Sequence, residues 1–302
     1  MTKKLSFYLN PIYWPAWGIL GLFRLLTYLP YKAQLTCGRQ LGRLLNRLPT
    51  RLCAVTQTNI RLCFPELSEA EQQRLIKRNL ENVGMGIFET AMAWWLPDHK
   101  LERLVEISGL EHSDAAFARG KGIILLSPHF TCLEIMGRLI SMKYAFTALY
   151  RPHKKKFMAF LLENFRPRRQ VTYIPTTRVR LLAKALEENQ AIWYAYDVDG
   201  GKKRSVFAPF FGVQTASLTS ISRLAALTGA SIIPIGFYRR DDNSGYQLKI
   251  APALDQVPSE DWVADAKHLN SALEKAIRQK PEQYLWQYKR FKTRPDGEER
   301  IY

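Results

Sequence analysis

Residues 120–134 read GKGIILLSPHFTCLE and carry the pattern that decides the fold of this chain of 302 residues. The four apolar residues at 123–126 are typical of a short, buried strand. A helix with an apolar face is predicted to follow, with Thr131 as its N-cap. His129 then lies on the turn between the strand and the helix, because the Ser-Pro pair before it is unfavourable for helix.

His129 and Glu134 are the candidate catalytic residues of this turn. Five positions apart in one helix, they would point about 140° away from each other. They can meet only if His129 precedes the helix and Glu134 reaches back to it. A carboxylate beside the donating nitrogen of a neutral imidazole fixes its tautomer and stabilises the imidazolium. Such a pair can activate a hydroxyl for attack on an acyl carbonyl. The alternative is a strand-end histidine beside a chance acid.

The composition predicts a folded, strongly basic protein. Hydrophobic residues make up 47% of the chain, and 44 Lys and Arg against 27 Asp and Glu give a net charge of +17. This excess predicts a polyanionic partner, which can be anionic lipid, nucleic acid or an acidic protein. The four cysteines lack the spacing of a metal site and indicate a reducing compartment.

An apolar run at residues 12–29 predicts a retained membrane anchor within residues 1–30. Aromatic residues lie toward both ends of the run, as in interfacial belts. The run is short for a spanning helix, and Arg24 is costly in mid-bilayer, so spanning and interfacial anchors both stay open. Basic residues after the run keep the main domain cytoplasmic if it spans, or bind anionic headgroups if it lies flat. A buried core helix is the remaining alternative.

Strands alternate with helices across residues 120–280, which predicts an α/β fold with a mostly parallel central sheet flanked by helices. We expect residues 31–302 to form a single domain whose first part, to about residue 100, is helical. Gly84 and Gly86 are expected either to interrupt a helix or to let it pack closely. The site is predicted at the strand ends, where His129, Arg151 and Asp197 fall.

Several stretches resemble known acyltransferases. Residues 129–134 match the His-x4-Asp/Glu motif of the glycerolipid-type acyltransferases. Nearly the whole chain resembles the lipid A late acyltransferases, most strongly their lauroyl-transferring branch. The resembling segments are 59–68, 83–95, 150–152, 193–199, 206–212 and 281–295.

This resemblance implies transfer of a fatty acyl chain, lauroyl in that branch, in lipopolysaccharide biosynthesis. The donor would be acyl-acyl carrier protein, and the acceptor the hydroxyl of a 3-hydroxyacyl chain on a Kdo-bearing lipid A precursor. The enzyme would act at the bacterial inner membrane, facing the cytoplasm, without cofactor or metal. His129 would be the base and Glu134 its orienting acid.

Three further residues are predicted to bind substrate, namely Arg151, Arg166 and Asp197. The resemblance implicates Arg166 and Asp197 in activity. The alternative is that these two residues form a structural ion pair with each other.

Two rival functions stay open. One is acylation of another membrane lipid. The other is a non-catalytic basic protein that binds membrane or nucleic acid. The apolar entry segment and the absence of any nucleic-acid-binding signature disfavour nucleic acid, so inner-membrane lipids are the expected surface partner.

Overall fold

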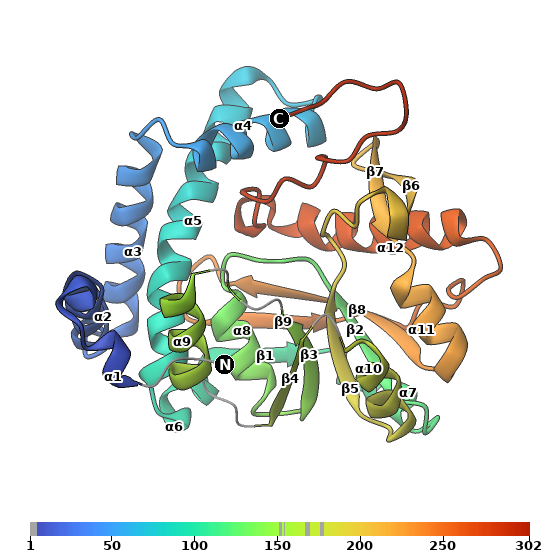
Figure 1. The fold of residues 1–302 in the computed structure, drawn as a ribbon, viewed down its shortest axis with the longest axis horizontal. Helices are drawn as coiled ribbons and strands as arrows, with labels where there is room; N and C mark the ends of the chain where they lie inside the picture. The colour runs from blue at the N-terminus through green and yellow to red at the C-terminus, as the bar shows by residue number, and fades with distance from the viewer. Residues whose placement is uncertain (1–4, 151–152, 154, 167–169, 176–177) are drawn as a thin grey trace.

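The computed structural model describes residues 5–150, 153, 155–166, 170–175 and 178–302. Arg151, one of the predicted substrate-binding residues, lies outside them. Figure 1 shows a central sheet with helices packed around it. The helices are α1 (Leu5–Tyr8), α2 (Trp14–Leu26), α3 (Tyr31–Asn46), α4 (Arg51–Cys63), α5 (Glu69–Trp95), α6 (Asp98–Leu101), α7 (Leu110–Phe117), α8 (Leu133–Ile140), α9 (Lys156–Phe165), α10 (Arg180–Glu187), α11 (Ser220–Thr228) and α12 (Trp262–Gln279).

In the described part of the chain, the central sheet has seven strands in the order β1-β9-β8-β2-β5-β3-β4. These are β1 (Val105–Ser108), β2 (Ile123–Ser127), β3 (Phe146–Tyr150), β4 (Val171–Pro175), β5 (Ala191–Ala195), β8 (Ser231–Arg239) and β9 (Tyr246–Ile250). Among the described strands of this sheet, β8 and β9 pair antiparallel and the other neighbours pair parallel. A separate hairpin joins β6 (Ser205–Phe210) to β7 (Val213–Leu218). The prediction of a mostly parallel α/β sheet flanked by helices is confirmed.

Both faces of the sheet are apolar, which explains why β2 reads as an unbroken hydrophobic run. Ile124 and Leu126 pack with α10, α11 and α12 on one face. Ile123 and Leu125 pack with α8 on the other. Successive strand residues point to opposite faces, so one short strand serves both cores.

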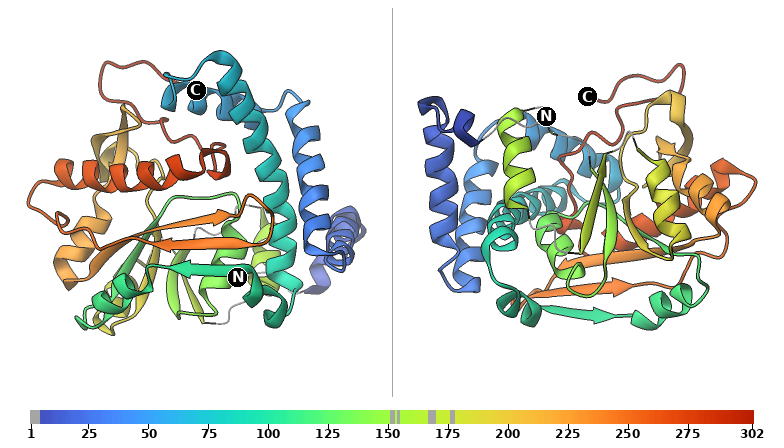
Figure 2. Two further views of the ribbon diagram at one scale, coloured as in Figure 1. Left: turned by 180° about the vertical axis from the view of Figure 1, so that it is seen from behind. Right: turned by 60° about the horizontal axis from the view of Figure 1, so that its bottom comes forward.

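Helices α3 and α5 pack side by side along one flank of the sheet, with α2 outside them (Figure 2). Glycines make this contact close, because a Cβ on Gly84 would lie 2.2 Å from the carbonyl oxygen of Gly38. Gly86 brings α5 equally close to the carbonyl oxygen of Thr131. Helix α5 therefore runs without interruption, and its glycines serve close packing.

The N-terminal apolar run forms η1 (Pro11–Tyr13) and α2, and the chain then turns at Pro30 into α3. Tyr8 is fully buried against Phe157 and Phe160 of α9. Within the described part of the chain, every helix is too short or too polar to cross a membrane.

Candidate active site

His129 and Asp197 come together because of the register between two parallel strands. Ser127 at the end of β2 lies opposite Ala195 at the end of β5. His129 and Asp197 each lie two residues beyond these partners. Their side chains therefore meet at the carboxyl edge of the sheet, where ligands of open α/β folds usually bind.

The contact between the two residues is bidentate. His129 Nδ1 lies 2.6 Å from Asp197 Oδ1, and the His129 backbone N–H donates to Oδ2 at 2.8 Å. The carboxylate is 2% exposed, whereas 26% of the imidazole surface is open. An ionised carboxylate only accepts hydrogen bonds, so Nδ1 holds the proton and Nε2 is left as an acceptor. This is the tautomer that a general base needs.

The two groups shift each other's pKa in opposite directions. Burial alone would lower the pKa of His129, but the charge and hydrogen bond of Asp197 outweigh burial and raise it. Burial has the opposite effect on Asp197 and would raise its pKa. The His129 ring and backbone N–H outweigh burial and lower the pKa of Asp197 overall. Asp197 therefore stays ionised and favours a proton on the imidazole.

The C-terminal segment fixes the turn that carries His129. The Leu285 backbone N–H donates to the His129 carbonyl at 2.9 Å, and Thr131 N–H donates to the Gln283 carbonyl at 2.8 Å. Buried Asn79 of α5 in turn donates to the Tyr284 carbonyl at 2.7 Å. His129 is thus held in place by segments that are far apart in the sequence.

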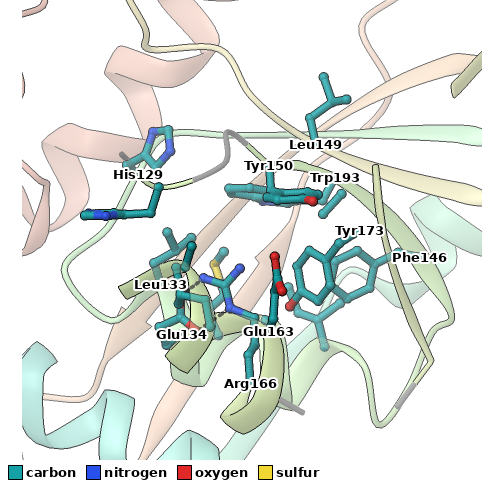
Figure 3. A pocket seen from close by; sticks show the side chains of 17 residues that line it. His129, Leu133, Glu134, Phe146, Leu149, Tyr150, Glu163, Arg166, Tyr173 and Trp193 are labelled. Atoms are coloured by element: carbon teal, nitrogen blue, oxygen red, sulfur yellow. Dashed lines mark hydrogen bonds and ion pairs between the residues drawn. The ribbon is translucent and has the colours of Figure 1, made fainter. Parts of the chain in front are cut away.

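The prediction that Glu134 orients His129 is wrong, because Asp197 occupies the position at Nδ1. Glu134 forms a two-pronged ion pair with Arg166, one bond of which joins Arg166 Nε to Glu134 Oε2 at 2.9 Å. Figure 3 shows this pair at one side of a cavity, where the Arg166 guanidinium also lies 5.0 Å from the centre of the Tyr173 ring. The alternative that Arg166 pairs with Asp197 is therefore also wrong.

The start of the helix explains why Glu134 cannot reach back. Helix α8 begins at Leu133, and its N-cap is Cys132, without a side-chain bond. The prediction of Thr131 as N-cap is therefore wrong. Glu134 is the second residue of the helix, and its carboxylate extends toward Arg166, just after α9.

Two cavities meet at His129, and both are also lined by Trp193 and Leu149. The first has a volume of about 400 Å³ and lies between α8, α9 and β3. We call it the apolar cavity after the aliphatic and aromatic side chains that line it away from His129, a part that we call its deep end. That part is lined by Met136, Gly137, Ile140, Phe146, Ala148 and Ala159, and the cavity is also lined by Glu134, His153, Glu163 and Arg166.

The second cavity, of about 940 Å³, is lined by Lys203, Arg204 and Arg223, and we call it the basic cavity. None of these cations forms an ion pair with the acidic residues described in the structure. Asp199 also lines this cavity, but its carboxylate accepts from the backbone N–H groups of Thr293 and Gly201.

The sequence matches the family described as bacterial lipid A biosynthesis acyltransferase over residues 1–293. The chain belongs to this family. It is 37% identical to the lipid A biosynthesis lauroyltransferase of Escherichia coli (strain K12), covering 96% of this chain and 95% of that protein.

It is also 35% identical to the lipid A biosynthesis palmitoleoyltransferase of the same strain, covering 98% and 96% of the two chains. The myristoyltransferase of that strain is 24% identical, with 96% and 90% covered. This lipid A acyltransferase is thus about equally similar to two relatives that are named for different acyl chains.

Proposed function

We propose that this enzyme transfers a fatty acyl chain, lauroyl or one of similar length, from acyl-acyl carrier protein to a hydroxyl of a Kdo-bearing lipid A precursor. The acceptor group is the hydroxyl of a 3-hydroxyacyl chain already attached to the precursor. The observation that carries this proposal is the His129–Asp197 pair at the junction of an apolar and a basic cavity.

The pair supports a complete acyl transfer. His129 Nε2 takes the proton of the acceptor hydroxyl as its oxygen attacks the thioester carbonyl. Asp197 stabilises the imidazolium that forms. When the tetrahedral intermediate collapses, the carbon–sulfur bond breaks and the imidazolium returns its proton to the departing thiolate. The products are an ester and a free thiol.

The two cavities divide the substrates by chemistry. The apolar cavity suits a hydrocarbon chain whose thioester end lies at His129, since burying apolar surface is favourable. The unpaired cations of the basic cavity suit the phosphate groups of the acceptor. The Glu134–Arg166 pair closes one wall of the apolar cavity and is proposed to position the acyl donor. The net charge of +17 also favours an acidic carrier protein.

The N-terminal helices support a site of action at the inner membrane. Tyr8 and Trp17 attach this segment to α9, while the other side of α2 is strongly exposed. Ile19, Leu22 and Leu25 are 58%, 55% and 65% exposed. We propose that this face lies in the cytoplasmic surface of the membrane, as amphipathic anchors do.

Product analysis tests the proposal. Purified full-length protein in detergent is given acyl-acyl carrier protein and either a Kdo-bearing lipid A precursor or glycerol phosphate. Mass spectrometry is expected to show one added acyl group on the lipid A precursor alone. Acylation of glycerol phosphate alone, or of neither acceptor, would refute the proposal.

A further inference from the structure

Gly137 of α8 stands out from the glycines of the neighbouring helices. Gly38, Gly42, Gly84 and Gly86 lack a side chain because backbone atoms lie within 2.6 Å of where their Cβ would be. A Cβ on Gly137 would meet nothing within 4 Å. Glycine inside a helix is destabilising relative to alanine, and close packing does not explain its presence at position 137.

The open space beside Gly137 belongs to the apolar cavity. Leu133, Gly137 and Ile140 all line that cavity. They share one face of α8, because they are spaced by four and three residues. Leu133 is near His129, and Ile140 is at the far end of the helix beside Phe146, where β3 begins. From Leu133 to Ile140 the helix rises about 10 Å, and Gly137 lies near the middle of that path.

We infer that Gly137 sets the length of acyl chain that this enzyme accepts. This inference rests on the proposed function. With no side chain at position 137, the hydrocarbon passes along α8 and its end reaches Ile140 and Phe146. A larger residue at 137 would fill the cavity part-way and select shorter chains. Close-packed protein interiors yield little, so turnover is expected to fall sharply for chains that are too long for the shortened cavity.

The test is a competition between acyl-acyl carrier proteins of eight to sixteen carbons, with full-length enzyme and product lengths read by mass spectrometry. Gly137→Leu is expected to move the preferred chain to a shorter one. The preference for the wild-type chain should fall by about tenfold or more for each methylene that no longer fits. Gly137→Ala is expected to give a smaller shift in the same direction, with a melting temperature at least equal to wild type.

Two further variants sharpen the result. Ile140→Ala enlarges the deep end and is expected to lengthen the preferred chain. Ala226→Leu is the control, because Ala226 is a small exposed helical residue in α11 that does not line the cavity. Its length profile should match wild type.

An unaltered length profile in folded Gly137→Leu overturns the inference, as does an equal loss for every chain length. In both cases, acyl transfer by the wild-type enzyme would still support the proposed function. A wild type that transfers no acyl group from any donor refutes the proposed function itself. If Gly137→Leu does not fold, the opposite shifts expected of Gly137→Ala and Ile140→Ala decide the matter.

Discussion

The bond between His129 and Asp197 determines how the imidazole titrates. Its pKa is raised overall, so the neutral base forms only above the ordinary histidine value of about 6.5. In the pH profile of kcat/KM, the acid limb, where activity falls as the imidazole is protonated, is therefore expected to have its midpoint above that pH. The limb reports the free enzyme, where the two residues already face each other.

Asp197→Asn is expected to lower kcat by roughly 10²–10⁴-fold, since the amide no longer holds the imidazole in the required tautomer. The acid limb should also move to lower pH, because the negative charge is lost while burial remains. A pH profile of kcat/KM measures both effects. Asp199→Asn is the matched control, and it should leave the limb in place because Asp199 bonds to Thr293 and Gly201. An unmoved limb in Asp197→Asn would show that this residue does not set the base.

The Glu134–Arg166 pair is half-buried, with 19% and 21% of the two side chains exposed. Removing either charge leaves the other without its partner in a poorly solvated place. Glu134→Gln and Arg166→Gln are each expected to lower the melting temperature and kcat/KM. The double variant should be no worse than either single one, with a coupling of about 0.5–3 kcal/mol. Strictly additive losses would mean that the two residues act separately.

Helix α2 exposes several large apolar side chains to solvent. Replacing Ile19, Leu22 and Leu25 by serine is expected to weaken binding to anionic liposomes roughly 100-fold, given ~1 kcal/mol or more for each side chain. Co-sedimentation measures this. Leu227→Ser on α11 is the control, because Leu227 is 73% exposed but distant in the fold. Equal liposome binding by the triple variant and wild type would place the membrane contact elsewhere.

Most elements could be predicted from local sequence signals. Ser68 and Glu71, three residues apart, form a capping box at the start of α5, and the apolar run at residues 123–126 forms β2. The uninterrupted course of α5 could not be predicted. Gly84 and Gly86 break local helix propensity, and only the partners Gly38 and Thr131 explain them.

For the whole molecule, the sequence predicted the fold class and the edge of the sheet that carries the candidate site. It did not predict which residues of the site contact each other. His129 and Asp197 were both expected at strand ends. Their contact follows from the pairing of β2 with β5, which strand patterns alone do not specify. The His-x4-Glu spacing favoured Glu134 because local motifs are visible in a sequence and strand neighbours are not.

Other long-range contacts could not be predicted from the sequence either. Glu89 and Arg239 form a fully buried ion pair at 2.6 Å, although 150 residues separate them. The contacts of Leu285 and Gln283 with the His129 turn likewise depend on the finished fold. The basic cavity is also lined by residues of different elements, such as Arg204 and Arg223.

We propose that His129 is the general base of acyl transfer. This role is tested by the turnover of purified His129→Gln with acyl-acyl carrier protein and the lipid A precursor. Glutamine can donate an N–H to Asp197, so the melting temperature should stay near wild type, but it cannot take the hydroxyl proton. We expect turnover to fall by roughly 10²–10⁴-fold. Turnover near wild type in the folded variant would show that His129 is not the general base.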